Sequence, residues 1–134
     1  MALEYILVAD DTPEFREKMV AAFHKMGYIT ENNYQVKEFM DGKTLLNFYH
    51  KHSEQVSMIL TDNQMPEMTG LDIMRNLDNI VYVISSTPRL KERVKNDPTL
   101  RKTAAQRIYD KYDENVYGQI IDNAIEKGLL KRLK

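Results

Sequence analysis

Polar residues that can act on phosphate groups follow the short apolar runs of this sequence. They are Asp10 and Asp11, Asp62, Ser85 with Ser86, and Lys111. Carboxylates that lie within a few ångströms of one another stay ionised together only if a cation neutralises them. Because no cysteine is present and the candidate ligands are oxygen atoms, a hard ion such as Mg²⁺ is expected. Such a set suits phosphoryl transfer, in which one acid accepts the phosphoryl group and the others hold metal.

Taken singly, these residues have ordinary structural explanations. Asp10 and Asp11 could simply end a strand and cap a helix, and Asp62 followed by Asn63 is a common turn pair. Lys111 lies in a charged stretch, where a lysine is usually a solvated surface side chain. The combination is more specific, because each group follows a different predicted strand. Lys111 and a serine hydroxyl would then contact phosphoryl oxygens.

The elements that would position these residues alternate between strands and helices. Strands are expected over five runs: Tyr5–Ala9, Gln35–Phe39, Val56–Leu60, Ile80–Ile84 and, more weakly, Arg107–Asp110. Helices are expected from Pro13 to Met26, around Leu45 to Tyr49, over Gly70–Leu77, and from Tyr117 to Ile125. This alternation predicts an α/β fold with a parallel sheet, whose ligands bind beyond the carboxyl ends of the strands.

Local signals mark the ends of several of these elements. Thr12 is placed to cap the first helix, Pro13 to occupy its first position and Gly27 to end it. The basic tail at 131–134 suits the end of the last helix, where cations complement the helix dipole. The three histidines are interpreted as surface residues away from the acids: His24, His50 and His52.

Length and composition indicate one ordinary domain. The chain has 134 residues, 43% of them hydrophobic and 29% charged, with a formal net charge of −1. This balance gives no strong field for nucleic acid or an acidic membrane. The sequence has neither a signal-peptide pattern nor an apolar run of about 20 residues. We therefore expect a single cytoplasmic domain over residues 1–134, without an output domain, a membrane span or direct nucleic-acid binding.

Two stretches resemble the receiver domain of bacterial response regulators. They are Ile6-Leu7-Val8-Ala9-Asp10-Asp11 and Thr61-Asp62-Asn63-Gln64-Met65-Pro66-Glu67-Met68-Thr69-Gly70-Leu71. The second stretch is the stronger signal, and the turn at Asp41-Gly42 also matches. The resemblance implies a doubly wound, flavodoxin-like sheet of five parallel strands in the order 2-1-3-4-5.

The resemblance also implies a role for each residue of the acidic group. Asp62 would accept the phosphoryl group, and Ser85 and Lys111 would contact it. The metal ligands would be Asp11, Asp62 and the backbone carbonyl of Gln64, with Asp10 acting largely through water. The phosphoryl donor would be a sensor histidine kinase, a phosphotransfer protein or a small phosphodonor.

A domain of this type catalyses its own phosphorylation with Mg²⁺ and hydrolyses its own acyl phosphate. It is a switch rather than a turnover enzyme, and it would signal through contact with an unknown downstream protein. The resemblance leaves open a dimer that forms on phosphorylation.

The sequence departs from the family pattern in three places. Tyr112 follows Lys111 where the family has proline, so we expect a trans peptide and an altered loop. Ile108 stands where the family has an aromatic switch residue, and the neighbouring Tyr109 should face the other side of the strand. In the stretch 88–106, Asn96-Asp97-Pro98 should break a helix.

These departures keep two alternatives open. The chain could be a degenerate receiver that only binds partners, as Ile108 and Tyr112 suggest. A haloacid-dehalogenase-like phosphatase also uses an aspartate nucleophile with Mg²⁺, but it needs an Asp-X-Asp motif, whereas Asp10 and Asp11 are adjacent.

Overall fold

Five strands form one parallel sheet in the computed structural model, which describes residues 3–28 and 34–132. The strands are β1 (Glu4–Ala9), β2 (Tyr34–Phe39), β3 (Val56–Asp62), β4 (Val81–Ser85) and β5 (Ile108–Asp110). Their order is β2-β1-β3-β4-β5, so the predicted fold class and strand order are confirmed. The fifth strand begins one residue later than predicted, because Arg107 closes a 3₁₀ helix that leads into it.

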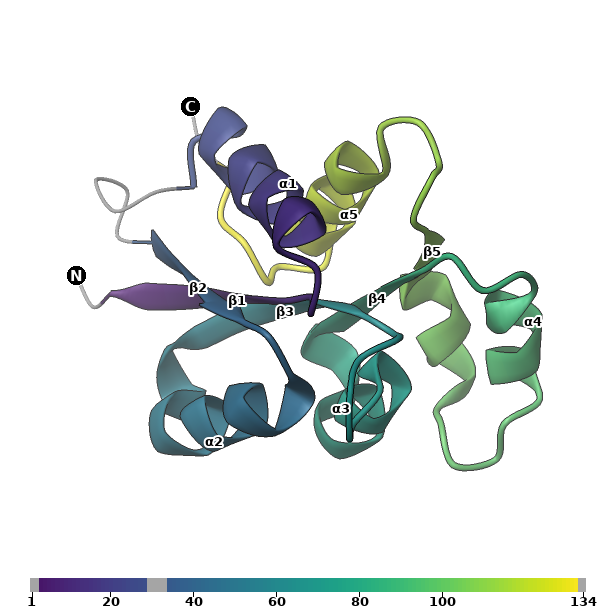
Figure 1. Cartoon of the computed structure of the whole chain (residues 1–134). Coiled ribbons are helices and arrows are strands. Elements are labelled where there is room, and N and C mark those ends of the chain that lie inside the picture. The colour runs from purple at the N-terminus through teal and green to yellow at the C-terminus, as the bar shows by residue number, and fades with distance from the viewer. Residues whose placement is uncertain (1–2, 29–33, 133–134) are drawn as a thin grey trace.

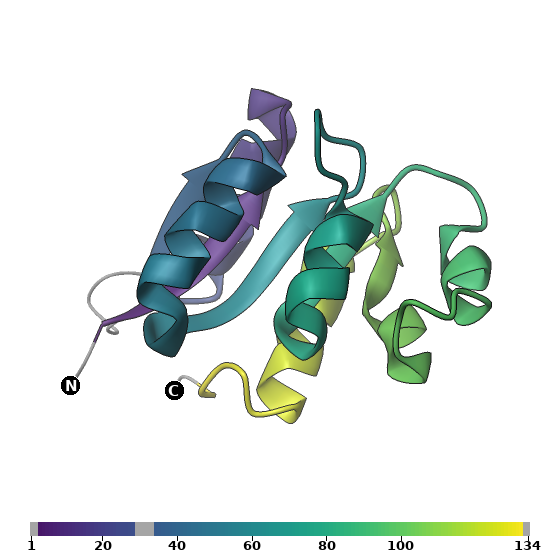
Figure 2. The ribbon, with the colours of Figure 1, turned by 90° about the horizontal axis from the view of Figure 1, so that it is seen from below.

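Helices cover both faces of the sheet, as Figures 1 and 2 show. Two helices, α1 (Pro13–Lys25) and α5 (Val116–Glu126), lie on one face. The other face carries α2 (Gly42–His52), α3 (Gly70–Leu77) and α4 (Leu90–Lys95). Short 3₁₀ helices complete the described chain: η2 (Ser53–Gln55), η3 (Asp78–Ile80) and η4 (Lys102–Arg107). None of the helices in the described ranges is long and apolar enough to cross a membrane.

The core has two halves, one on each face of the sheet. In β1, Ile6 and Val8 pack with residues of α1 and α5, whereas Leu7 and Ala9 pack with residues of α2 and α3. All four are completely buried, because successive side chains of a strand point to opposite faces. Burial on both faces explains why β1 is continuously apolar from Tyr5 to Ala9, up to the carboxylate of Asp10.

The ends of α1 agree with their predicted signals in position but not in every contact. Pro13 begins the helix, and Gly27 follows its end with φ of 88°. Thr12 occupies the cap position with extended backbone, but its side chain makes no capping hydrogen bond. Its backbone N–H instead donates to Oδ1 of Asp10, 2.8 Å away. The backbone of Thr12 therefore holds the carboxylate of Asp10 at the end of β1.

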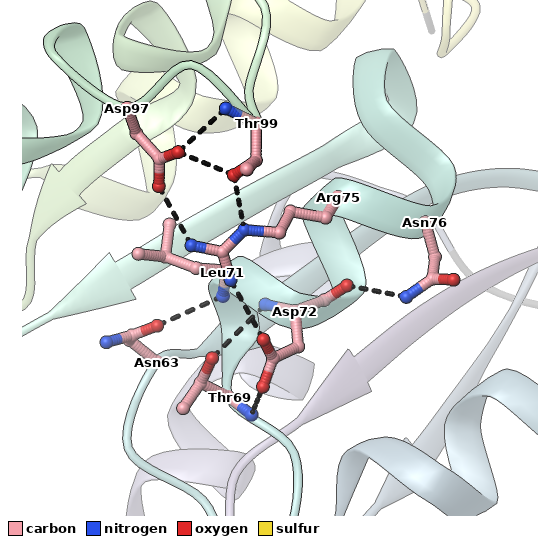
Figure 3. Close-up of polar contacts among 8 residues, drawn as sticks. All are labelled: Asn63, Thr69, Leu71, Asp72, Arg75, Asn76, Asp97 and Thr99. Atoms are coloured by element: carbon pink, nitrogen blue, oxygen red, sulfur yellow. Dashed lines mark hydrogen bonds and ion pairs between the residues drawn. The ribbon is translucent and has the colours of Figure 1, made fainter.

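The segment between β4 and β5 differs most from a regular helix-strand repeat. α4 ends at Lys95, two residues before Asp97, so the predicted break at 96–98 is confirmed. Arg75 of α3 holds the loop that follows α4. Its guanidinium donates to the carboxylate of Asp97, at 2.8 Å, and to Oγ1 of Thr99, at 2.8 Å (Figure 3). This contact anchors the loop after α4 to α3.

Residues 131 and 132 of the basic tail lie beyond the last turn of the last helix, which corrects the expectation that the tail forms its cation-rich end. α5 ends at Glu126, and Gly128 follows with φ of 79°. Lys131 is bound through its backbone instead, since its N–H donates to the Tyr34 hydroxyl and its carbonyl accepts from the Tyr28 hydroxyl. Residues 133–134 of the predicted tail lie outside the described residues.

One histidine also differs from its interpretation as a surface residue. His52 is half-buried, with its ring 4.4 Å from that of Phe48 and 5.6 Å from that of Tyr5, measured between centroids. His24 and His50 are exposed, as expected.

Candidate functional site

Three carboxylates meet where β1 and β3 end. Asp10, Asp11 and Asp62 each offer an oxygen atom, and these atoms all lie within 4.8 Å of one another. The parallel register pairs Ala9 of β1 with Thr61 of β3, so the next residues of the chain, Asp10 and Asp62, arrive side by side. Asp10 is 0% exposed and Asp62 is 4% exposed, whereas Asp11 is open to solvent. The predicted meeting of the three acids is therefore confirmed.

Lys111 reaches the same point from the end of β5. Its Nζ lies 3.1 Å from Oδ2 of Asp10 and 3.2 Å from Oδ1 of Asp62. The backbone N–H of Lys111 donates to the carbonyl of Ser85, 2.9 Å away, so β4 holds the start of the loop. The lysine side chain is only 8% exposed. It is therefore a buried partner of two acids rather than the solvated surface side chain that its charged surroundings alone would indicate.

The pKa values reflect this crowding of charge. Burial raises the pKa of Asp62, the charge of Asp10 raises it further, and Lys111 only partly offsets these effects. Burial alone would lower the pKa of Lys111, but the hydrogen bonds and charges of Asp10 and Asp62 outweigh it, so this pKa is raised. With its three acids ionised and one ammonium, the site carries a formal charge of −2. Its oxygen ligands and its charge fit a hard divalent cation such as Mg²⁺.

Asp10 is held by its own neighbours in the chain. Its Oδ1 accepts from the N–H of Thr12, and its Oδ2 accepts from Lys111. Its backbone carbonyl accepts from Nη1 of Arg16 at 2.8 Å, and its N–H donates to the carbonyl of Phe39. Both carboxylate oxygens of Asp10 thus have a partner within the protein.

The turn from β3 into α3 fixes the backbone of Asp62. The side chain of Asn63 accepts from the N–H of Leu71 at 3.0 Å (Figure 3). The backbone carbonyl of Asn63 accepts from the N–H of Gly70 at 3.1 Å. A Cβ atom on Gly70 would lie 2.8 Å from the carbonyl oxygen of Asp62. Glycine is therefore required here for space, which explains part of the sequence motif that begins at Asp62.

A reciprocal cap completes the start of α3. The N–H of Thr69 donates to Asp72, while the hydroxyl of Thr69 accepts from the N–H of Asp72 (Figure 3). This capping box satisfies amide groups at the start of the helix. The hydrogen bonds from Thr69, with the charge of Arg75, hold the pKa of Asp72 below its ordinary value.

Ser85 and Gln64 lie at this edge of the sheet, but their side chains make contacts that the sequence did not predict. Ser85 is buried, and its Oγ accepts from the N–H of Thr87 at 2.9 Å. Nε2 of Gln64 donates to the hydroxyl of Thr87 at 3.1 Å, which joins the loops after β3 and β4. Thr87 is thus a site neighbour that sequence reasoning missed, because it lies two residues beyond the strand end.

Phe15 is a second neighbour that sequence reasoning missed. Phe15, Met19 and Phe23 are spaced four residues apart, which is typical of one apolar stripe on a helix. Phe15 is nevertheless only half-buried, whereas Met19 and Phe23 are completely buried. The centroid of its ring lies 3.9 Å from Nζ of Lys111. Helical spacing could not show this contact, because the lysine comes from the far end of the chain.

The residues around Lys111 have the arrangement that was expected from the departures from the family pattern. Ile108 is buried on the α4 side of the sheet, while Tyr109 packs on the α5 side near Tyr82, so the two face opposite ways. The peptide bond between Lys111 and Tyr112 is trans. Tyr112 is 72% exposed, and its N–H donates to Oδ1 of Asp110. Asp110 thus turns the chain at the position where the family has proline.

Comparisons with known proteins agree with this fold. The family model of the response regulator receiver domain matches residues 6–107, most of the chain. The chain is similar to the chemotaxis protein CheV1 of Helicobacter pylori, with 33% identity over 79 residues, 55% of this chain. That alignment spans only 22% of the length of CheV1.

Two solved structures illustrate the likeness of fold. A response regulator receiver domain protein from Clostridium thermocellum has a TM-score of 0.70, at 20% identity over 95% of this chain and 94% of that one. The complex of CheX, CheY, BeF₃ and Mg²⁺ from Borrelia burgdorferi gives 0.69, at 19% identity over 95% and 90%. At these identities the structures support the fold alone. The family match and the sheet order together show that the chain belongs to the response regulator receiver domain family of two-component signalling.

Proposed function

We propose that this receiver accepts a phosphoryl group on Asp62 from the phosphohistidine of a sensor histidine kinase or a phosphotransfer protein. The observation that carries the proposal is the position of Lys111, whose ammonium bonds to both Asp62 and Asp10. A buried lysine held between two acids supplies a fixed positive charge where a transferring phosphoryl group needs one. A small phosphodonor such as acetyl phosphate would serve the same site.

The chemistry assigned to Asp62 is a displacement at phosphorus. Since Lys111 contacts Oδ1, we assign the attack to Oδ2. A new O–P bond forms as the P–N bond of phosphohistidine, or the P–O bond of acetyl phosphate, breaks. The electron pair of the broken bond leaves with the imidazole or the acetate, and Asp62 becomes an acyl phosphate. Lys111 and the hydroxyl of Ser85 stabilise the phosphoryl oxygens.

The acidic group would hold Mg²⁺ through oxygen ligands. The ligands in this proposal are Asp11, Asp62 and the backbone carbonyl of Gln64, with Asp10 acting through water. When bound, the ion would neutralise negative charge on the phosphoryl oxygens. The site charge of −2 supports this assignment, as does the structural neighbour from Borrelia burgdorferi, which is a complex with BeF₃ and Mg²⁺.

Hydrolysis would return the switch to its starting state. Water attacks phosphorus, the O–P bond to Asp62 breaks, and the electron pair returns to the carboxylate as inorganic phosphate and a proton are released. Between these two events the phosphoryl group adds negative charge beside Lys111 and the loop that holds Ser85 and Thr87. The phosphorylated form would then signal by contact with a downstream protein.

Labelling with radioactive acetyl phosphate tests the proposal. The wild-type protein should incorporate phosphate in the presence of Mg²⁺ and lose the label when the ion is chelated. Asp62→Asn should abolish incorporation. Asp72→Asn replaces a carboxylate that contacts Thr69 and Arg75 (Figure 3) and should leave incorporation unchanged.

Full labelling of Asp62→Asn would refute the assignment of Asp62. An unlabelled wild-type protein whose amide spectrum does not respond to Mg²⁺ at Asp10, Asp11 or Asp62 would instead support the degenerate receiver. Steady hydrolysis of phosphomonoesters without acetyl phosphate would support a phosphatase.

A further inference from the structure

Lys111 has an aromatic neighbour in addition to its two acids. Its Nζ lies 3.9 Å from the centroid of the Phe15 ring. An ammonium within about 6 Å of an aromatic face is attracted by the negative charge of that face, and the attraction grows when the ammonium is desolvated. The lysine side chain is only 8% exposed. The geometry therefore favours a strong ring–ammonium contact.

Phe15 is held in a fixed position relative to Asp10. It is the third residue of α1, which begins at Pro13. The next residue, Arg16, donates to the carbonyl of Asp10 at 2.8 Å and forms an ion pair with Glu38 of β2 at 3.4 Å. These contacts fasten the first turn of α1 to the ends of β1 and β2. The ring is therefore part of the rigid frame of the site.

The loop that carries Lys111 packs against the same ring. The rings of Tyr112 and Phe15 meet edge to face, with centroids 6.4 Å apart and planes at 73°. Tyr112 stands where the family has proline. This departure from the family pattern is therefore accompanied by an aromatic pair between α1 and the β5–α5 loop. Phe15 thus contacts both the side chain of Lys111 and the residue that follows it.

The two acidic partners of Lys111 change when the phosphoryl group arrives, but the ring does not. In the proposed reaction Asp62 becomes an acyl phosphate, and Asp10 lies beside the metal. We infer that Phe15 is a positioning residue, whose aromatic face keeps the ammonium of Lys111 directed at Asp62 throughout the phosphorylation cycle. This inference rests on the proposed function of Asp62.

Fluorinated phenylalanines inserted at position 15 provide the most direct test. Each fluorine weakens the negative face of the ring and changes its shape little, so a purely structural role would not follow the series. The maximal rate of labelling by acetyl phosphate should fall with each fluorine, by about 2- to 30-fold over the series, and the affinity for beryllofluoride should fall in parallel. Phe15→Leu, which has no aromatic face, should show the full loss of labelling rate and of beryllofluoride affinity. Phe15→Tyr should retain the labelling rate.

Lys18 provides a matched control. Its Nζ also lies over the Phe15 ring, at 5.1 Å from the centroid, but Lys18 is exposed and forms no ion pair with the three acids in the described part of the chain. Lys18→Gln should therefore change the rate less than about twofold. Equal rates across the fluorinated series, in a protein that still labels at Asp62, would overturn the role of Phe15 and leave the proposed function intact. Failure of the wild-type protein to label would remove both.

Discussion

Asp62 lies beside a second buried acid, and this arrangement opposes folding when no metal is bound. The pKa of Asp62 is raised by burial and by Asp10, so its ionised form is disfavoured in the folded protein. A raised carboxyl pKa means that stability is greatest below the ordinary value and declines as pH rises through the folded-state value. Above the folded-state pKa the native state therefore carries the full unfavourable contribution of this group.

Replacing Asp62 should stabilise the protein in the absence of divalent ions. Asp62→Asn removes one of three clustered charges, while the amide oxygen can still accept from Lys111. We expect a gain of roughly 0.5–2 kcal/mol, or an increase in Tm of about 2–8 °C, in thermal unfolding with a chelator present.

Asp72→Asn provides the contrasting control for this experiment. Hydrogen bonds from Thr69 and the charge of Arg75 lower the pKa of Asp72, so its loss should reduce Tm. A lower Tm for Asp62→Asn as well would show that the charge of Asp62 favours folding.

The residue types of the site could be predicted from sequence, whereas some of their contacts could not. Asp10, Asp62 and Lys111 each follow an apolar run, and strand ends in a parallel sheet meet at one edge. Nothing in the spacing of Phe15 distinguishes a core side chain from one that covers a lysine. The hydrogen bond between Gln64 and Thr87 likewise depends on how two loops fold toward each other.

At the scale of elements, the start of α3 leaves no room for a side chain at its first residue, Gly70. A Cβ on Gly70 would lie 2.8 Å from the carbonyl oxygen of Asp62 and 3.1 Å from Cα of Asn63. Both are backbone atoms, so the strand end itself would have to move.

Gly70→Ala should therefore destabilise the protein by roughly 1–3 kcal/mol and also slow phosphorylation, because it displaces Asp62. Gly42→Ala is a matched control, since Gly42 also begins a helix but its Cβ would meet only side-chain atoms of Ile73 and Met68, at 3.1 Å. Urea unfolding and acetyl phosphate labelling measure both effects. Equal stability and labelling in the two variants would contradict this explanation of Gly70.

The loop after α4 is held to α3 by a charged contact that should respond to acid. The side chain and backbone of Thr99, together with Arg75, lower the pKa of Asp97 to about 2 (Figure 3). A lowered carboxyl pKa contributes stability above the ordinary value, and that contribution is lost as pH falls through about 2. The loop should therefore stay anchored until strongly acidic pH.

NMR titration of the Asp97 carboxyl should show a midpoint near 2 in the wild-type protein. Thr99→Val should raise that midpoint, because it removes the hydroxyl while keeping the N–H donor. Arg75→Gln should raise it as well. An unchanged midpoint in both variants would mean that these contacts do not form in solution.

Element boundaries were predictable where the signals are local and less so elsewhere. Pro13, Gly27 and the break before Pro98 act on their own neighbours, and each appears where expected. Arg89 and Asn115 adopt left-handed backbone, with φ of 61° and 58°, just before α4 and α5. Neither arginine nor asparagine reliably predicts a left-handed backbone conformation. The sequence therefore does not fix the residues at which these helices begin.

At the scale of the whole molecule, sequence alone predicted the class of fold but not the order of its strands. Alternating strands and helices indicate a parallel sheet, and the two-sided burial of β1 agrees with a central strand. The expected strand order followed from the family resemblance in the Asp62–Leu71 motif. Sequence spacing alone does not give the order, because it depends on contacts such as those between β1 and β3, which join residues some fifty positions apart. The position of Lys131 likewise depends on residues far away in the sequence, Tyr28 and Tyr34.

A crystal structure of the protein with Mg²⁺ and beryllofluoride would test the central proposal most directly. We predict a beryllium–oxygen bond at Asp62, an ion coordinated by Asp11, Asp62 and the carbonyl of Gln64, and the ammonium of Lys111 bonded to a fluorine. An adduct on another residue, an ion bound away from these acids, or a lysine that turns to solvent would contradict it.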